Sequence, residues 1–212
     1  MLNIAELSAF ILVVFGLFLI PGPAVLLMIS RSAHEGTKTG IITGLGIATG
    51  DFIHVLLAAV GFSAILMTST VAFNIVKIAG AAYLLYMGIR ALLAKASSIK
   101  MPDVVQESLL KVYRHGILVE ALNPKTALFF LALFPQFVNA ESGTIVTQFL
   151  ILGVIFVVLT VIYTTILSFF TGTIGQLIKR GNGINRWGQK VLGLLYIGLG
   201  LQVLLLGPHS FF

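Results

Sequence analysis

Long apolar stretches, separated by short polar or charged segments, run along the whole chain of 212 residues. Breaking the sequence at its charges and polar clusters leaves six segments near the length of about 20 residues that a membrane-spanning helix needs. They are residues 5–30, 39–66, 71–93, 116–138, 145–172 and 188–206. The gaps at 68–70 and 139–143 are short enough to predict tight hairpins. The pattern predicts an all-α, polytopic membrane protein of six transmembrane helices.

Composition supports a membrane protein and excludes several classes of function. Hydrophobic residues make up 58% of the chain and charged residues only 9%, against roughly 25% charged in soluble domains. Cysteine is absent, which excludes disulfides, thiolate metal sites and iron–sulfur clusters. There is no GxSxG or HExxH motif, so we expect no enzyme, no metal and no cofactor. The N-terminal residues MLNIAELSAF lack the basic start of a removable signal peptide.

Most of the 13 Lys and Arg residues lie in three predicted loops, so the net charge of +6 does not indicate a nucleic-acid partner. The three groups are Arg31 and Lys38; Arg90, Lys95, Lys100, Lys111 and Arg114; and Lys179, Arg180, Arg186 and Lys190. Basic loops of membrane proteins usually face the cytoplasm. We therefore predict that these loops are cytoplasmic and that both termini and the two tight hairpins face outward.

The polar segment 94–115 divides the chain into two halves, 1–93 and 116–212, each with three predicted spans. LLYMG at 84–88 in the first half matches LLYIG at 194–198 in the second. Because each half has an odd number of spans, a repeat would place the second half upside down relative to the first. Inverted three-helix repeats are typical of secondary transporters; chance similarity of two short apolar segments is the alternative.

Prolines interrupt the first span of each half: Pro21-Gly22-Pro23 lie in one, and Asn123-Pro124 lie in the other. Proline has no backbone N–H, so the carbonyl four residues earlier loses its helical partner. A break of this kind in lipid is stable only when the freed backbone is buried in protein or lines a wet cavity. The alternative is a simple kink without a binding role.

The breaks predict specific unpaired backbone groups. The first two prolines leave the carbonyls of Leu17 and Leu19 without helical partners, and Pro124 does the same to the carbonyl of Glu120. A new half-helix begins near Ala24, and its N–H groups and dipole suit a carboxylate.

Four charged residues lie within the predicted spans and away from their ends: Asp51, Lys77, Glu120 and Lys125. Asp51 is about 18 Å into its span at 1.5 Å per residue, near the bilayer midplane. His54 lies three residues later on the same helix face, where the two side chains can share a proton or form a structural pair. Lys77 starts its span, so its side chain is expected to reach the interface.

Two further polar residues accompany Glu120 and Lys125. Asn123 shares a helix face with Glu120, and Lys125 is roughly 15 Å deep, so its ammonium needs a cavity. Tyr163 is a weaker candidate for that cavity, because tyrosines in spans are more often packing or interface residues.

Three sequence runs carry a family resemblance. FLIPGPAVLLMISRSAHEGTKTGIITGLGIATGD, KIAGAAYLLYMGIRAL and LVEALNPKTALFFLALFPQFV together resemble the LysE/RhtB family of amino-acid exporters, over nearly the whole chain. The motif residues are Pro21, Gly22 and Pro23; Gly44, Gly46, Gly50 and Asp51; and Asn123, Pro124 and Lys125. The resemblance implies proton-driven efflux of amino acids across the bacterial cytoplasmic membrane by a homodimer, with a neutral substrate such as homoserine, threonine or leucine.

The resulting hypothesis is alternating access around a central pocket within the lipid bilayer. The predicted substrate site comprises Pro21, Gly22, Pro23, Ala24, Asp51, Glu120, Asn123, Pro124, Lys125 and Tyr163, and the predicted proton-coupling residues are Asp51, His54 and Glu120. A permease for another small solute or ion, and a passive membrane channel, remain the alternatives.

Overall fold

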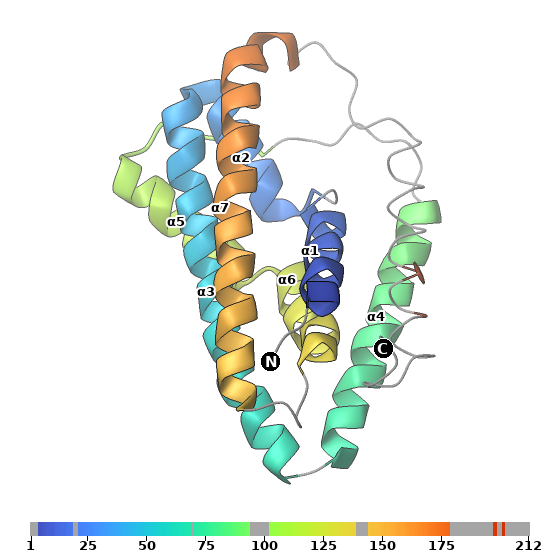
Figure 1. Ribbon diagram of the computed structural model, residues 1–212. Helices are drawn as coiled ribbons and strands as arrows, with labels where there is room; N and C mark the ends of the chain where they lie inside the picture. The colour runs from blue at the N-terminus through green and yellow to red at the C-terminus, as the bar shows by residue number, and fades with distance from the viewer. Residues whose placement is uncertain are drawn as a thin grey trace.

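The protein is described here from a computed structural model. The described residues are 4–18, 21–68, 70–93, 102–138, 144–178, 197–198 and 201. They are helical apart from short connections (Figure 1). The predicted sixth span, 188–206, and its LLYIG sequence lie almost entirely outside the described residues, as does the predicted hairpin 139–143.

The helices follow one another with few connecting residues. They are α1 (Ile4–Phe18), α2 (Pro23–Glu35), α3 (Thr37–Thr68), α4 (Thr70–Leu93), α5 (Leu109–Ala121), α6 (Pro124–Leu128), a π-helical turn (Phe129–Leu133), a 3-10 turn (Phe134–Phe137) and α7 (Ile145–Ile178). The tight hairpin predicted at 68–70 is confirmed, because α3 ends at Thr68 and α4 begins at Thr70.

Both predicted helix breaks are present. α1 and α2 meet at an angle of 62°, and α5 meets the segment Pro124–Phe137 at 45°. Each second half-helix begins at a proline, Pro23 in α2 and Pro124 in α6. This is the favoured first helical position for proline, because its missing N–H would have no helical partner there. The predicted breaks in the first and fourth spans are therefore confirmed.

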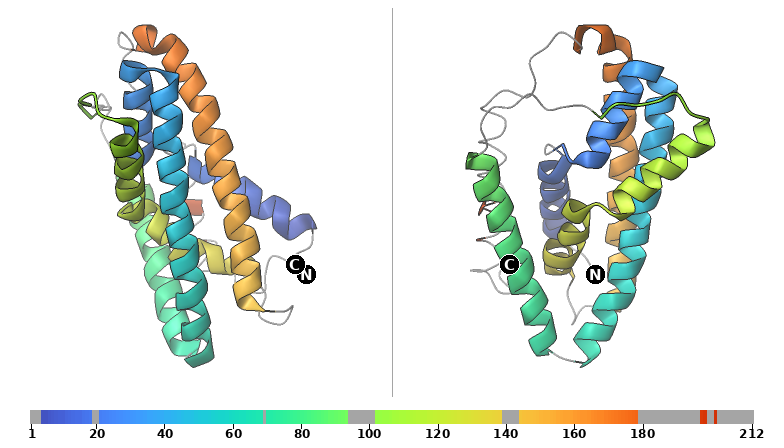
Figure 2. Two further views of the ribbon diagram at one scale, coloured as in Figure 1. Left: turned by 90° about the vertical axis from the view of Figure 1, so that its left-hand side faces the viewer. Right: turned by 180° about the vertical axis from the view of Figure 1, so that it is seen from behind.

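Two long helices form the spine of the molecule. α3 and α7 lie side by side, α5 packs against α3, and α1 and α6 approach each other beside α7 (Figures 1 and 2). α3 and α5 meet backbone to backbone at Gly46 and Gly116, where an added Cβ on Gly46 would collide with the carbonyl oxygen of Tyr113. Small residues allow such close approach in membrane helices.

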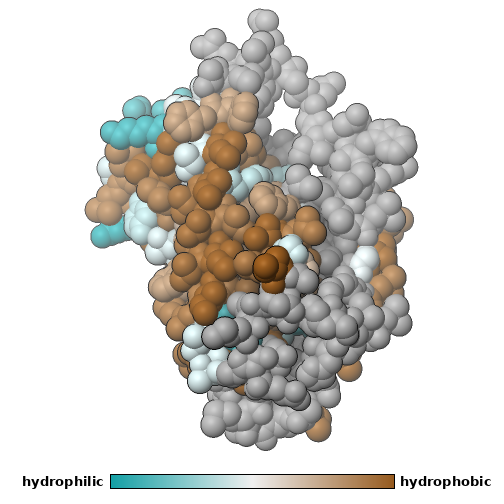
Figure 3. Space-filling view, in the orientation of Figure 1, coloured by the Kyte–Doolittle hydropathy of each residue, from teal (hydrophilic) through white to brown (hydrophobic). Residues whose placement is uncertain are grey.

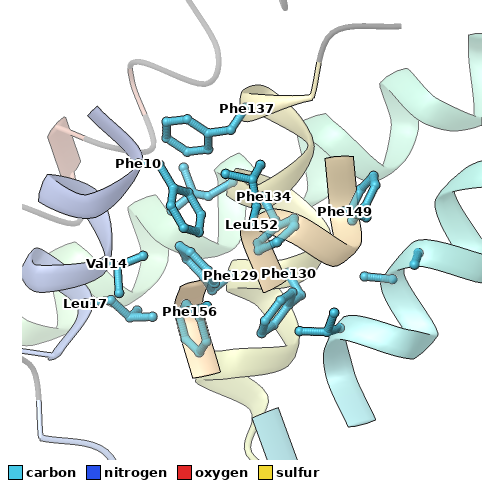
Figure 4. Close-up of a cluster of buried hydrophobic side chains, with 14 of the residues drawn as sticks. Phe10, Val14, Leu17, Phe129, Phe130, Phe134, Phe137, Phe149, Leu152 and Phe156 are labelled. Carbon is cyan, nitrogen blue, oxygen red and sulfur yellow. The ribbon is translucent and has the colours of Figure 1, made fainter. Parts of the chain in front are cut away.

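Aromatic side chains fill the space between α1, the segment Phe129–Phe137 and α7 (Figure 4). Phe10 of α1 contacts Phe134 edge to face at 5.5 Å between ring centroids, and Phe134 stacks on Phe149 of α7 at 5.2 Å. All three rings are fully buried. Edge-to-face and offset stacked rings attract beyond their contact area, so this cluster fixes the first broken helix against the second.

The predicted ends of two spans are wrong. Arg31 was placed in a loop, but α2 continues to Glu35 and only Gly36 separates it from α3. Gly36 adopts φ of +94°, which only glycine takes without strain, so one residue suffices for the turn. The fourth span begins at Leu109 rather than 116, because charged residues such as Lys111 are good helix formers and continue the helix beyond its apolar part.

Two unbroken stretches are long and apolar enough to cross a membrane, Thr37–Gly61 and Ile145–Gly172, and the two bent pairs raise the total to four if each pair is one span. This count concerns the described residues. The helical membrane class is supported; the sixth span and the inverted repeat stay predictions. Figure 3 shows an extended hydrophobic surface along α7, with hydrophilic residues gathered at the end where α5 begins.

Candidate functional site

A small cavity lies where the two helix breaks meet α3 and α7. Its volume is about 30 Å³, which is room for one or two water molecules. The lining combines polar and apolar side chains: Leu17, Phe18, Gly22, Val25, Ile47, Asp51, Glu120, Asn123, Lys125, Thr126, Phe156, Thr160, Tyr163 and Thr164. Six helices contribute, α1, α2, α3, α5, α6 and α7, so the site exists only when both halves of the chain are in place.

Asp51 and Glu120 bring two carboxyl groups together in this cavity. Asp51 comes from the middle of α3 and Glu120 from the end of α5, and each is 3% exposed. The two carboxyl groups are close enough to interact electrostatically. The hydroxyl of Thr160, on α7, donates to Oδ2 of Asp51 at 2.8 Å. The two acids predicted to be separate candidates therefore form one pair.

Asn123 holds the second carboxyl group in place. Its side-chain Nδ2 donates to both carboxyl oxygens of Glu120 at 3.2 Å. The two side chains meet, but not on a shared helix face as predicted, because α5 ends at Ala121 and Asn123 has an extended backbone. Its Oδ1 accepts a hydrogen bond of 3.1 Å from the backbone N–H of Lys125 and so caps the start of α6. One asparagine thus orients Glu120 and begins the next half-helix.

Lys125 places a positive charge beside the carboxyl pair. Its ammonium is close enough to Asp51 and Glu120 to interact electrostatically with both. It also lies against Gly22, whose added Cβ would be 3.3 Å from Cδ of Lys125. The cavity that this deep lysine was predicted to need is present, and a side chain on Gly22 would displace it.

The backbone groups freed by proline are satisfied across the two halves of the chain. Nζ of Lys125 donates to the carbonyl oxygen of Leu17 at 2.9 Å. The ring Nε2 of His54 lies 3.0 Å from the carbonyl oxygen of Glu120. Pro21 and Pro124 remove the helical partners of these two carbonyls, as predicted, but the carbonyl of Glu120 also accepts a hydrogen bond of 2.9 Å from the backbone N–H of Asn123. The third carbonyl, of Leu19, lies outside the described residues.

Tyr163 supplies another contact of this kind. Its hydroxyl donates to the carbonyl oxygen of Phe18, the last residue of α1, at 2.9 Å, and its ring stacks on that of Phe18 at 4.8 Å. The weaker sequence candidate therefore lines the cavity and caps the first break.

The remaining predicted residues shape the site without lining the cavity. Pro23 and Pro124 are exposed at the starts of their half-helices. Ala24 is buried in a small apolar cluster with Met28 and Ile47. Pro21 is half-buried at the break, and His54 holds the backbone of Glu120. The imidazole thus faces the second break, and its predicted role in proton transfer stays a prediction.

Apart from Tyr163, the polar residues that α7 contributes to the site were not predicted from the sequence. Thr160 and Thr164 line the cavity, and Ser168 and Thr171 continue a buried row of hydroxyls away from it. The signal was present, because hydroxyl residues recur every three or four positions within an otherwise apolar segment and so share one helix face.

The charged groups around the cavity are complementary to a zwitterion. Two carboxyl groups suit an ammonium, while the Lys125 ammonium and the N-terminus of α2 suit a carboxylate. Across the part of the chain that the structure describes, no three His, Asp or Glu side chains are placed to hold a metal ion.

Comparison with known proteins identifies the family. The model of the LysE type translocator family matches residues 10–207, which include every residue of the cavity. The chain belongs to the LysE type translocator family.

This LysE type translocator has relatives of the same length. It is 30% identical to the uncharacterized membrane protein YrhP of Bacillus subtilis strain 168, over 93% of this chain and 97% of that protein. It is 28% identical to the leucine efflux protein of Enterobacter sp. strain 638, over 89% and 90%. It is also 28% identical to the uncharacterized membrane protein PA4757 of Pseudomonas aeruginosa, over 95% and 96%. No solved structure matches the chain.

Proposed function

We propose that this translocator exports neutral amino acids across the bacterial cytoplasmic membrane in exchange for protons. The observation that carries the proposal is the carboxyl pair of Asp51 and Glu120 beside Lys125, buried between two broken helices. The family and the leucine efflux relatives support an amino-acid cargo. Intramembrane ionisable residues usually mark an ion or substrate path.

The charges of the cavity suit a zwitterion of no net charge. The substrate ammonium would contact the carboxyl pair, and its carboxylate would contact Lys125 and the N-terminus of α2. Apolar lining residues are placed to receive an uncharged side chain: Leu17, Phe18, Val25, Ile47 and Phe156. A lysine or arginine cargo would bring a second cation into this apolar wall, which disfavours such substrates.

Proton coupling follows from the same charge count. Two ionised carboxyl groups and one ammonium leave a net charge of −1, and one proton on the pair removes it. A net charge enclosed within the bilayer is costly, so the site without cargo holds one proton. A zwitterion adds no net charge, so its ammonium would compete with that proton for the carboxyl pair while its carboxylate is met by Lys125 and the positive end of the α2 dipole. Proton and cargo would then occupy the site in turn.

Alternating access is part of this proposal, and the small size of the site supports it. A cavity of about 30 Å³ is too small for any amino acid. In the proposed cycle, the helices around it separate on one side to admit cargo and on the other to release it. The proposal also includes three expectations from the sequence: outward-facing termini, an inverted repeat and a homodimer.

Transport by everted membrane vesicles tests the function. Acidifying the lumen should drive uptake of leucine or threonine, and nigericin, which collapses the pH gradient, should abolish it. Asp51→Asn should reduce gradient-driven uptake to the level of vesicles without the protein, whereas Asp103→Asn, an exposed acid outside the site, should retain it. Undiminished proton-driven uptake by Asp51→Asn would remove Asp51 from the coupling role. Flux independent of the gradient in the parent protein would indicate a channel.

A further inference from the structure

Arg31 forms a buried ionic junction at the far end of α2 from the cavity. The residue is only 3% exposed. Nη1 donates to Oε1 of Glu35 at 2.5 Å and to the carbonyl oxygen of Val105 at 2.6 Å, and Nη2 donates to Oε2 of Glu107 at 2.6 Å. Glu35 lies one turn away on the same helix, whereas Val105 and Glu107 belong to the extended segment before α5. Arg31 therefore ties two separate parts of the chain together.

The residues on either side of Arg31 extend this junction. Ser30 donates to the carbonyl oxygen of Pro102 at 2.7 Å, and Ser32 donates to the carbonyl oxygen of Ser168, on α7, at 2.8 Å. Both serines are fully buried. Three consecutive residues thus fasten the end of α2 to residues 102–107, named here the strap, and to α7.

The strap is firmly anchored at its other end. It leads directly into α5, which begins at Leu109. α5 packs on α3 with no room between Gly46 and the backbone of Tyr113 and Gly116. Because α5 is fixed to α3 in this way, each bond from α2 to the strap also holds α2 against the pair α3–α5.

Between this junction and the cavity, α3 packs closely against α2 and α7. An added Cβ on Gly40 would be 2.6 Å from Cβ of Ser32 and 2.8 Å from Oγ of Ser168, and one on Gly44 would be 2.5 Å from Oγ1 of Thr164. Cargo approaching from the strap side must move α2 away from α3 and α7. The surfaces that would separate carry hydroxyl groups, which water solvates readily once they part.

We propose that Arg31 and Glu107 form the gate on the strap side of the transport path: their ion pair holds α2 closed, and its opening admits cargo to the cavity. This inference rests on the proposed transport function. Opening leaves no buried charge without a partner, since Glu35 moves with Arg31 on α2. Glu107 is 34% exposed, so water can take over its carboxylate. The gate therefore opens at a far lower cost than breaking a fully buried pair.

The absence of cysteine from the chain gives a direct test. A single Val25→Cys variant places a thiol in the cavity wall, and a membrane-impermeant maleimide is applied to vesicles of known orientation. A separate Asp103→Cys variant identifies which face carries the strap. Glu107→Gln should raise the labelling rate of Val25→Cys from the strap side several-fold, and Glu107→Lys should raise it further. Asp103→Asn removes a charge from the same strap and should leave the rate unchanged.

The labelling assay does not depend on transport, so the gate and the proposed function fail separately. Equal labelling in the parent, Glu107→Gln and Glu107→Lys would overturn the gate, even if leucine export were demonstrated. Increased labelling from both faces would also overturn it, because that result indicates general loosening of the fold. Increased labelling from the strap side alone, with no transport of any amino acid, would retain the gate and refute the proposed cargo.

Discussion

The two sides of the cavity are built from different chemistry along the same helix, α7. On one side, the aromatic side, Phe149 and Phe156 of α7 pack with phenylalanines of α1 and of the second broken helix. On the other, the hydroxyl side, Thr164 and Ser168 of α7 face glycines of α3. α7 thus carries an interlocked aromatic contact with α1 and the second broken helix at one end and a close, polar contact with α3 at the other.

This difference indicates how each side would open. On the aromatic side, the interdigitated rings must separate before the helices can part, and the dispersion energy of their contacts is lost. Separating the hydroxyl side costs less. Thr164 donates to the carbonyl of Thr160 in its own helix, and this hydrogen bond is kept when α3 and α7 separate. We therefore expect the hydroxyl side to separate at lower cost and the aromatic side to act as the firmer barrier.

The largest loss of stability should come from removing the charge of Lys125, which lies between the aromatic side and the hydroxyl side. Lys125→Met removes the ammonium beside two buried carboxyl groups and leaves the carbonyl of Leu17 without its donor. Breaking a buried charged arrangement in this way should cost about 4 kcal/mol and abolish export. SDS titration in mixed micelles measures the stability, and Lys125→Arg, which keeps the charge, should recover part of it. Normal stability in Lys125→Met would contradict this account of the cavity.

The second largest loss of stability should come from a substitution on the aromatic side. Phe149→Ala removes a fully buried ring that stacks on Phe134, and the resulting cavity should destabilise the protein by about 3 kcal/mol. Phe170→Ala is the matched control on the same helix, since that ring is 61% exposed and should change the stability by less than about 0.5 kcal/mol. Similar losses in both variants would show that the cluster is not the tighter contact. The same titration measures both.

The hydroxyl side should give the smallest of the three effects. Gly44→Ala places a methyl group against Thr164 and forces α3 from α7, at a cost of about 2 kcal/mol. Gly61→Ala, on the same helix with open space around it, should be neutral or stabilising by about 0.5 kcal/mol. If Gly44→Ala were as harmless as Gly61→Ala, the contact between α3 and α7 would be looser than described.

The sequence alone was sufficient to predict the breaks and much of the cavity. Proline chemistry identified where the helices bend and which carbonyls need donors, and the cost of charge in lipid identified Asp51, Glu120 and Lys125. These inferences work because they depend on local covalent structure and on depth in the bilayer. The all-helical architecture followed from the length of the apolar runs in the same way.

What the sequence did not reveal depends on contacts between distant segments. Arg31 was assigned to a loop by its charge, because its partner Glu107 lies 76 residues away. The aromatic cluster was missed because its rings come from three separate elements and are ordinary apolar residues in each. The donors also could not be assigned: nothing local pairs His54 with the carbonyl of Glu120 or Lys125 with that of Leu17.

Those two donors make the halves of the protein mutually dependent. Lys125 follows the strap in the sequence and completes the first break, while His54 precedes the strap and completes the second. The first half inserted alone would lose the donor to the carbonyl of Leu17, whereas the second half would lose His54 but keep the N–H of Asn123 on the carbonyl of Glu120. When the chain is severed within residues 94–101, the first fragment should therefore depend more strongly on its partner than the second, and both should assemble when they are synthesised in the same membrane.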